Sequence, residues 1–171
     1  VGAFRAGTAP WTVPNHGWLT ANINYNVKDA LQSQAAGLGY SGAKIRRDLE
    51  RRISRLSAAD PWLKDHRPEV LWVKDVPPGR MEDTGKPAEC RRLLEAATRC
   101  AAEAWGQKPI IGLLHAWSDC SHLLRLGRMP TVGMGAGEAC AAHTATEFNR
   151  ISNVRNTAAS VALTILDLAG K

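Results

Sequence analysis

The side chains with the clearest potential for chemistry lie near the end of the chain, in the string Ala142-His143-Thr144-Ala145-Thr146-Glu147. Imidazole and carboxylate groups are both zinc ligands in proteins, so His143 is a candidate metal ligand. One histidine does not make a metal site, and no second histidine stands at the HxH, HxxxH or HExxH spacing. Spacing alone therefore favours a structural or exposed role for His143.

A glycine-rich segment, Gly133-Met134-Gly135-Ala136-Gly137, precedes that string. Its spacing fits neither nucleotide-binding fingerprint, and no Lys-Ser or Lys-Thr follows, so a plain turn is favoured over a phosphate loop. Earlier in the chain, Ser118-Asp119 is expected to cap a helix, or Asp119 stands behind a metal ligand. A triad of Ser118, His143 and Asp119 is rejected, because no nucleophile elbow surrounds the serine.

Hydrophobic periodicity predicts the elements that position these residues. Alternation over 18–26 predicts a strand, antiparallel to a first strand over 1–5. The predicted helices span 43–57, 87–105, 119–126 and 153–169. Further strands are predicted at 70–73, in the first part of the chain, and at 110–114 and 130–134 in the second. The last two alternate with helices and would form an α/β layer in the second half. The last helix is expected to direct apolar side chains inward: Val154, Ala158, Val161, Ala162, Ile165 and Leu166.

The composition is that of an ordinary globular protein, with 171 residues of which 44% are hydrophobic and 22% charged. No run approaches the roughly 20 apolar residues that cross a bilayer, and no signal peptide is recognisable. Four cysteines without a CxxC pair argue against a disulfide scaffold and against a zinc finger. We therefore expect a soluble, cytoplasmic protein without a membrane partner.

The net charge of +6 is unevenly placed, because five arginines fall within ten residues: Arg46, Arg47, Arg51, Arg52 and Arg55. On the predicted helix over 43–57 they lie opposite an apolar stripe. A solvated helix face is favoured over a nucleic-acid interface, because no aromatic residues are interleaved to stack on bases. No nucleic-acid partner is expected.

Taken in chain order, these segments resemble the C-terminal signature of a known family. Trp117-Ser118-Asp119-Cys120, the stretch 127–137, and Ala142-His143-Thr144 with Glu147 are similar to the family string "(S/T)DA … GIPTVxFGPG … AHxxNE" in order and approximate spacing. The family is that of acetylornithine deacetylase, succinyl-diaminopimelate desuccinylase, aminoacylase and related carboxypeptidases. The stretch 6–15 also resembles the family's "GGTAxNVVPD" motif.

The resemblance implies an α+β fold in two parts. Residues 1–80 would be a partial ferredoxin-like lid, or dimerisation, domain, and residues 81–171 the C-terminal half of an α/β zinc-peptidase catalytic domain. The implied activity is metal-dependent hydrolysis of amide bonds in N-acyl amino acids or small peptides. The implied cofactor is a pair of divalent ions, with zinc in first place and cobalt or manganese as alternatives.

By the same resemblance, His143 is a metal ligand, and Glu147 and Asp119 stand behind the ligands. The family's other ligands and its general base have no counterpart in this sequence. The resemblance therefore implies a missing N-terminal segment of the same enzyme, without which this chain is inactive. The implied substrate contacts include Ala116, Trp117 and Gly135.

Two further candidate substrate contacts depart from the family pattern. Trp11 stands where relatives have an asparagine that reaches the neighbouring subunit's site, and Asn24 stands where they often have an arginine that grips the substrate carboxylate. Asparagine does not replace a bidentate guanidinium, so we expect a neutral or differently held substrate. The lid implies a homodimer, and a non-catalytic dimerisation or assembly module is the alternative function.

Overall fold

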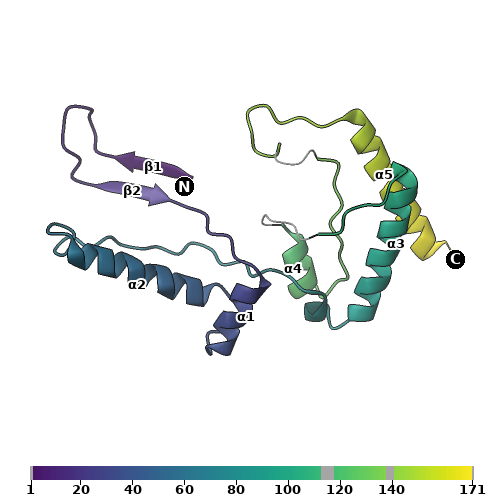
Figure 1. The fold of residues 1–171 in the computed structure, drawn as a ribbon, viewed down its shortest axis with the longest axis horizontal. Helices are drawn as coiled ribbons and strands as arrows, with labels where there is room; N and C mark the ends of the chain where they lie inside the picture. The colour runs from purple at the N-terminus through teal and green to yellow at the C-terminus, as the bar shows by residue number, and fades with distance from the viewer. Residues whose placement is uncertain (1, 113–117, 138–140, 171) are drawn as a thin grey trace. The chain divides into compact units, whose positions relative to one another are not determined.

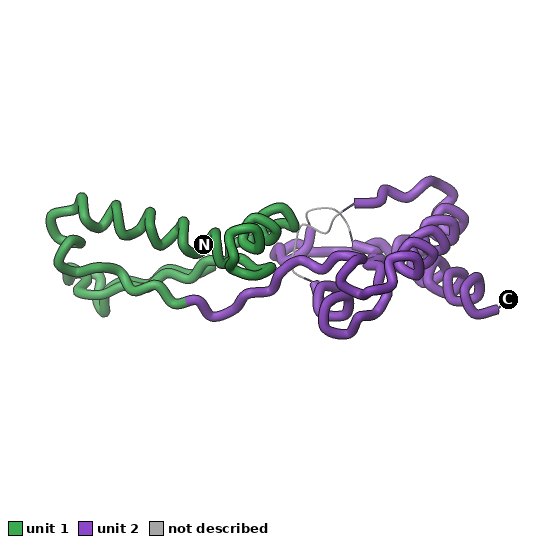
Figure 2. The backbone as a smooth tube through the Cα atoms, turned by 90° about the horizontal axis from the view of Figure 1, so that it is seen from below, with its two compact units in different colours: residues 1–71 green, residues 72–171 purple. Residues whose placement is uncertain are grey.

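The computed structural model describes residues 2–112, 118–137 and 141–170 (Figure 1). The chain divides into two compact units, residues 1–71 and residues 72–171, which Figure 2 colours separately. Helices make up most of the regular structure, and the described strands form one two-stranded antiparallel sheet. The chain is therefore of the α+β class. No described helix is both long enough and apolar enough to cross a membrane.

The sheet of unit 1 is a hairpin of β1 (Ala3–Ala6) and β2 (Gly17–Thr20), which pair antiparallel. This confirms the predicted antiparallel pair and its long connection. The connection begins at Gly7, whose φ of +68° is a conformation that favours glycine. β2 ends at Thr20, short of the predicted strand end, because no described strand lies beside residues 21–26 to hydrogen-bond with them.

Two helices complete unit 1. α1 (Val27–Ala35) is absent from the predicted elements, although Asn26 and Asp29 form a capping box at its start. The Asn26 side chain accepts from the Asp29 N–H at 3.2 Å, and the Asp29 side chain accepts from the Asn26 N–H at 2.9 Å. α2 (Ala43–Ala59) confirms the predicted helix. Ser33 of α1 is buried, and its Oγ accepts a hydrogen bond from a backbone N–H in the first turn of α2 at 3.1 Å.

Unit 2 is built from helices in its described part. α3 (Pro87–Trp105), α4 (Cys120–Arg125) and α5 (Ile151–Ala169) confirm three predicted helices. A short 3-10 turn, η1 (Met81–Thr84), precedes α3. α3 has a proline in its first turn and ends at Gly106, whose φ of +64° suits glycine, so local signals fix both of its ends.

α3 and α5 lie side by side and form the core of unit 2 (Figure 1). The buried side chains of both helices are small: Cys90, Ala96, Ala97, Cys100 and Ala101 of α3, and Ser160 and Thr164 of α5. The two hydroxyl groups donate to backbone carbonyls one turn earlier in α5, both at 2.7 Å, so they are buried with partners. An ion pair at 2.7 Å between Arg99 and Asp167 also links the two helices.

The apolar face of α5 is exposed, and the prediction that it points inward is wrong. The side chains expected inside are solvent-exposed: Val154, Ala158, Val161, Ala162, Ile165 and Leu166. The buried side of α5 carries Ser160 and Thr164 instead. The physical reason is the partner helix, because α3 presents alanine and cysteine side chains onto which small hydroxyl residues pack closely. No described element covers the apolar side of α5.

The further strands predicted at 70–73, in the first part of the chain, and at 110–114 and 130–134, in the second, are not formed in the described residues. Residues 70–73, 110–112 and 130–134 have neither strand nor helix backbone, and Leu113 and Leu114 lie outside the described ranges. A strand needs a neighbouring strand to hydrogen-bond with, and the described sheet consists of β1 and β2. The predicted α/β layer is therefore wrong for the described part of unit 2.

Candidate functional site

His143 lies in a turn between α4 and α5 and has a left-handed backbone, with φ at +63°. This conformation brings the Cβ of an L-residue close to a carbonyl oxygen, at a cost of about 1–2 kcal/mol. The Glu147 carboxylate stabilises the conformation, because its Oε2 accepts a hydrogen bond from the His143 N–H at 2.8 Å. The His143 side chain is exposed, and its ring forms no hydrogen bond with any described residue.

Thr144 closes the same turn. Its N–H and its Oγ1 both donate to the Ala141 carbonyl, at 3.3 and 2.8 Å, and its own carbonyl accepts from the Glu147 N–H at 3.1 Å. Thr144 is not among the predicted site residues, and a hydroxyl residue in a turn is the one local signal for its role. The structure places the Glu147 carboxylate on the backbone of His143 rather than on its ring.

The glycine segment 133–137 is an irregular connection. None of its glycines has a positive φ, so no left-handed turn requires them. A Cβ built at Gly135 or Gly137 would meet no atom of the described residues within 4 Å, and one at Gly133 would meet Cys120 Sγ at 3.8 Å. The space beside the backbone of these glycines is therefore open, and a ligand can approach the backbone closely there.

The start of α4 is capped by Ser118 rather than by Asp119. Ser118 Oγ accepts a hydrogen bond from the Cys120 N–H at 3.2 Å. Asp119 is exposed and makes no side-chain capping bond, although its carbonyl accepts from the His122 and Leu123 N–H groups. The helix therefore does not use the Asp119 carboxylate.

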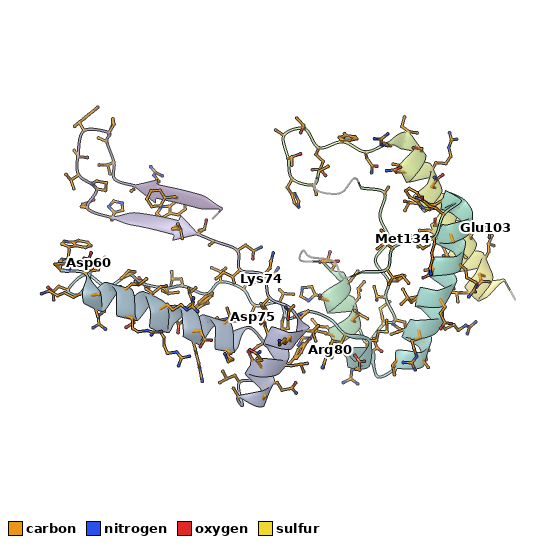
Figure 3. The ribbon with its side chains drawn as sticks, in the orientation of Figure 1. Asp60, Lys74, Asp75, Arg80, Glu103 and Met134 are labelled. Atoms are coloured by element: carbon orange, nitrogen blue, oxygen red, sulfur yellow. The ribbon has the colours of Figure 1, made fainter. Side chains whose placement is uncertain are left out.

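A partly buried ion-pair cluster attaches α4 to the segment before α3. Arg80, labelled in Figure 3, donates from Nε and Nη2 to Asp83 Oδ1 at 3.2 and 2.8 Å, and Arg125 Nε lies 4.0 Å from Asp83 Oδ2. Ser121 Oγ accepts from the Gly79 N–H at 3.2 Å, and a Cβ at Gly79 would meet atoms of α4 at 3.0 Å. The predicted site lacks these residues, and the Arg80-x-x-Asp83 spacing is the one local signal for them.

Trp11 and Asn24 belong to unit 1. Trp11 is 85% exposed in the β1–β2 connection, and Asn24 is exposed in the irregular segment after β2. An open hollow of about 280 Å³ lies at the hairpin and is lined by neither of them. Its lining residues are Arg5, Ala6, Gly7, Thr8, His16 and Trp18.

Of the predicted site residues that the structure describes, His143 and Glu147 are the pair joined by a hydrogen bond. Ala116 and Trp117 lie outside the described residues. Within the described ranges, no three or more histidine, cysteine, aspartate or glutamate side chains are placed to hold a metal ion together. An exposed imidazole fits one coordination position of a metal, but the described residues by themselves do not complete a site.

Comparison of the chain with models of protein families, with curated proteins and with solved structures finds no match. The function is therefore argued from the motifs of the chain and from the geometry of the His143 turn.

Proposed function

We propose that this chain is part of a metal-dependent hydrolase of amide bonds in N-acyl amino acids or small peptides, to which it contributes one metal ligand. The observation that carries the proposal is the His143 turn, in which a strained backbone is held by Glu147 and the ring is exposed. Strained residues persist where their surroundings over-determine them, and they are concentrated at functional sites. The family string around His143 assigns the ligand role to the same residue.

The proposed cofactor is a pair of divalent ions, with zinc in first place and cobalt or manganese as alternatives. Neutral imidazole suits zinc and neighbouring transition metals. Within this chain, His143 offers a ring nitrogen and Glu147 fixes the backbone that carries the ring. The remaining ligands and the general base would come from an N-terminal segment of the same enzyme, so this chain alone would be inactive.

The finer fold that we propose is a partial ferredoxin-like lid over residues 1–80 and the C-terminal half of an α/β zinc-peptidase domain over residues 81–171. The strands of this α/β domain are not formed in the described residues, and they would form when strands of the other half lie beside them. The β1–β2 hairpin supports the first assignment. The second is supported by the exposed apolar face of α5, because monomers seldom leave a large apolar patch uncovered. The missing half of a catalytic domain would cover that face.

Substrate contacts are proposed for Gly135, Ala116 and Trp117, and for Trp11 and Asn24 in the lid. The open space at Gly135 favours close approach of a ligand to the backbone. Asn24 lacks the charge and the paired donors of arginine, so the substrate would be neutral at this end or held by other groups. A homodimer through the lid is the proposed assembly.

The variant His143→Ala tests the proposal in the protein assembled with its N-terminal segment, by bound metal and by hydrolysis of N-acetyl amino acids. We expect metal affinity and hydrolysis to fall by more than about 100-fold, since even a residue behind a ligand is worth about 10–100-fold. His66→Ala is the control, because His66 is an exposed histidine of unit 1 whose ring stacks on Trp62 with centroids 4.1 Å apart. Equal metal content and equal rates in the two variants would refute the proposal.

A non-catalytic assembly module is the second candidate function. The β1–β2 hairpin, whose residues are all exposed, and the apolar face of α5 both offer surfaces for association. The module predicts a dimer of this chain in the presence of a chelator, measured by sedimentation. A chelator-resistant dimer, combined with an assembled protein that hydrolyses no N-acyl amino acid, would favour the module over the hydrolase.

A further inference from the structure

The positive charge of unit 1 is concentrated on one helix. α2 carries six basic and two acidic side chains, whereas the rest of residues 1–71 carries four of each. The surplus charge of the unit therefore comes from α2 alone. A surplus confined to one helix is the electrostatic pattern of a surface that binds a polyanion.

Arg47, Arg51 and Arg55 form a line along α2, here called the arginine row. They stand four residues apart, so successive members are about 6 Å apart along the helix axis and the row spans about 12 Å. All three side chains are exposed. Arg47 and Arg55 form no hydrogen bond or ion pair with any described residue, and Arg51 shares the carboxylate of Asp48 with Lys44. The row therefore keeps a positive charge that the described residues do not neutralise.

Another side of α2 is packed within unit 1. Ser57 is buried, and a hollow of about 260 Å³ lies between α2 and the segment that follows it. It is lined by Glu50, Ile53, Ser54, Ser57, Arg67, Pro68 and Val70. Figure 3 shows nitrogen-tipped side chains along the edge of α2 that faces away from the hairpin. Arginines four residues apart on a helix repel one another, and within the row Arg51 alone has an ion pair with a described residue, Asp48, that offsets this repulsion.

We propose that the arginine row binds the phosphate backbone of double-stranded nucleic acid, without regard to base sequence. Guanidinium groups stay charged and form paired hydrogen bonds with phosphate oxygens. The helix positions beside the row carry Lys44, Asp48, Glu50, Arg52, Ser54 and Ala58, so the row has no large apolar anchor of the kind that protein partners use. The exposed aromatic residue Trp62 lies beyond the end of α2 and its ring is stacked on His66, so α2 itself offers no aromatic platform for single strands.

The phosphate backbone of a duplex requires neither an apolar anchor nor a stacking platform. The sequence alone favours a solvated face for these arginines. The boundary of unit 1 adds that the surplus positive charge of this unit is carried by α2 alone, and this favours a binding surface. It is independent of the proposed hydrolase activity.

The test is binding of the full chain to a fluorescent duplex of about 20 base pairs, followed by anisotropy at several salt concentrations. Three phosphate contacts predict that the affinity falls about 40-fold between about 50 and 200 mM salt. The triple variant Arg47→Gln, Arg51→Gln, Arg55→Gln is expected to weaken binding and to reduce the salt slope by about 3. Circular dichroism checks that the variant keeps its helices, because loss of the mutual repulsion favours α2 whereas Arg51→Gln removes one ion pair of Asp48.

The matched control is Arg91→Gln, Arg92→Gln, Lys108→Gln, which removes the same charge from exposed positions of unit 2. This control is expected to keep most of the affinity and of the salt slope. An equal loss in both triple variants would overturn the proposal, and so would absence of binding at about 50 mM salt. Competition by polyglutamate as strong as that by unlabelled duplex would also overturn it, and would assign the row to an acidic protein.

Discussion

His143 is held in a backbone conformation that few non-glycine residues adopt, and its side chain is exposed. The other described non-glycine residue with a left-handed backbone is Arg128, with φ at +50°. Arg128 follows α4, and the N–H groups of Gly127 and Met129 on either side of it donate back to carbonyls of that helix at 3.1 Å. A helix end therefore accounts for Arg128. No helix end accounts for His143, whose backbone conformation depends on Glu147.

The strain at His143 is measurable by comparing two substitutions. Glycine adopts a positive φ without steric cost, whereas alanine keeps the Cβ contact that makes the conformation unfavourable. We expect the free energy of unfolding of His143→Gly, measured in urea, to exceed that of His143→Ala by about 1 kcal/mol. A glycine variant less stable than the alanine variant, as the entropy of the unfolded chain gives at an unstrained position, would show that the His143 backbone is not strained.

The elements divide into those that the sequence predicts and those that it does not. α3 is predicted to its ends, because Pro87 and Gly106 are signals carried by the residues at those ends. The buried face of α5 is not predicted, since it depends on the alanine and cysteine surface of α3, which is remote in sequence. The runs at 110–112 and 130–134 read as strands for their apolar character, but a strand also needs a neighbour.

The candidate site follows the same division. The sequence string pairs His143 with Glu147, and the structure joins them by a hydrogen bond. The left-handed backbone of His143 is not predicted, because few non-glycine residues adopt it and the surrounding turn decides where it occurs. The Arg80–Asp83–Arg125 cluster is not predicted either, because Asp83 and Arg125 are about forty positions apart in sequence.

Within α2, Asp48 provides a test of pH dependence. Hydrogen bonds from Lys44 and then Arg51 hold the pKa of the Asp48 carboxyl below its ordinary value of 3.8. Because the pKa is lowered in the folded state, ionised Asp48 contributes stability above about pH 4, and this contribution is lost as the pH falls through the folded-state pKa. We therefore expect Asp48→Asn to show a smaller loss of helical circular dichroism than the wild type when the pH is lowered from about 5 to 2.

Asp65→Asn is the control for this titration, because it removes an exposed carboxyl group of unit 1 that lies outside α2. The control is expected to follow the wild-type curve in helical signal. If Asp48→Asn follows the same curve as the wild type and Asp65→Asn, the ion pairs of Asp48 with Lys44 and Arg51 add nothing to the stability of the helix.

The whole molecule presents two different surfaces, one on each unit. Unit 1 exposes the arginine row, and unit 2 exposes the apolar face of α5, in which Ile151 is 81% exposed. A contiguous apolar patch is characteristic of a surface that another chain or segment covers. The proposed N-terminal segment would supply that cover.

Ile165→Lys separates the stability of this chain from its association. Ile165 is 59% exposed on α5, so we expect the substitution to change the free energy of unfolding of the isolated chain by less than about 0.5 kcal/mol. In the complex with the N-terminal segment the lysine would be buried without a partner, so the affinity measured by calorimetry should fall at least about 10-fold. Arg155→Lys, which keeps the charge at an exposed position of α5, should leave both quantities unchanged. Undiminished affinity of Ile165→Lys would mean that the segment does not cover this face.

Native mass spectrometry of the protein purified from its source tests the central claim most directly. We predict an assembly in which the 18.5 kDa chain is held together with an N-terminal segment of the same enzyme and two divalent metal ions. A spectrum that shows only 18.5 kDa chains and their dimers, free of metal, would contradict the hydrolase and leave assembly as the function of this chain.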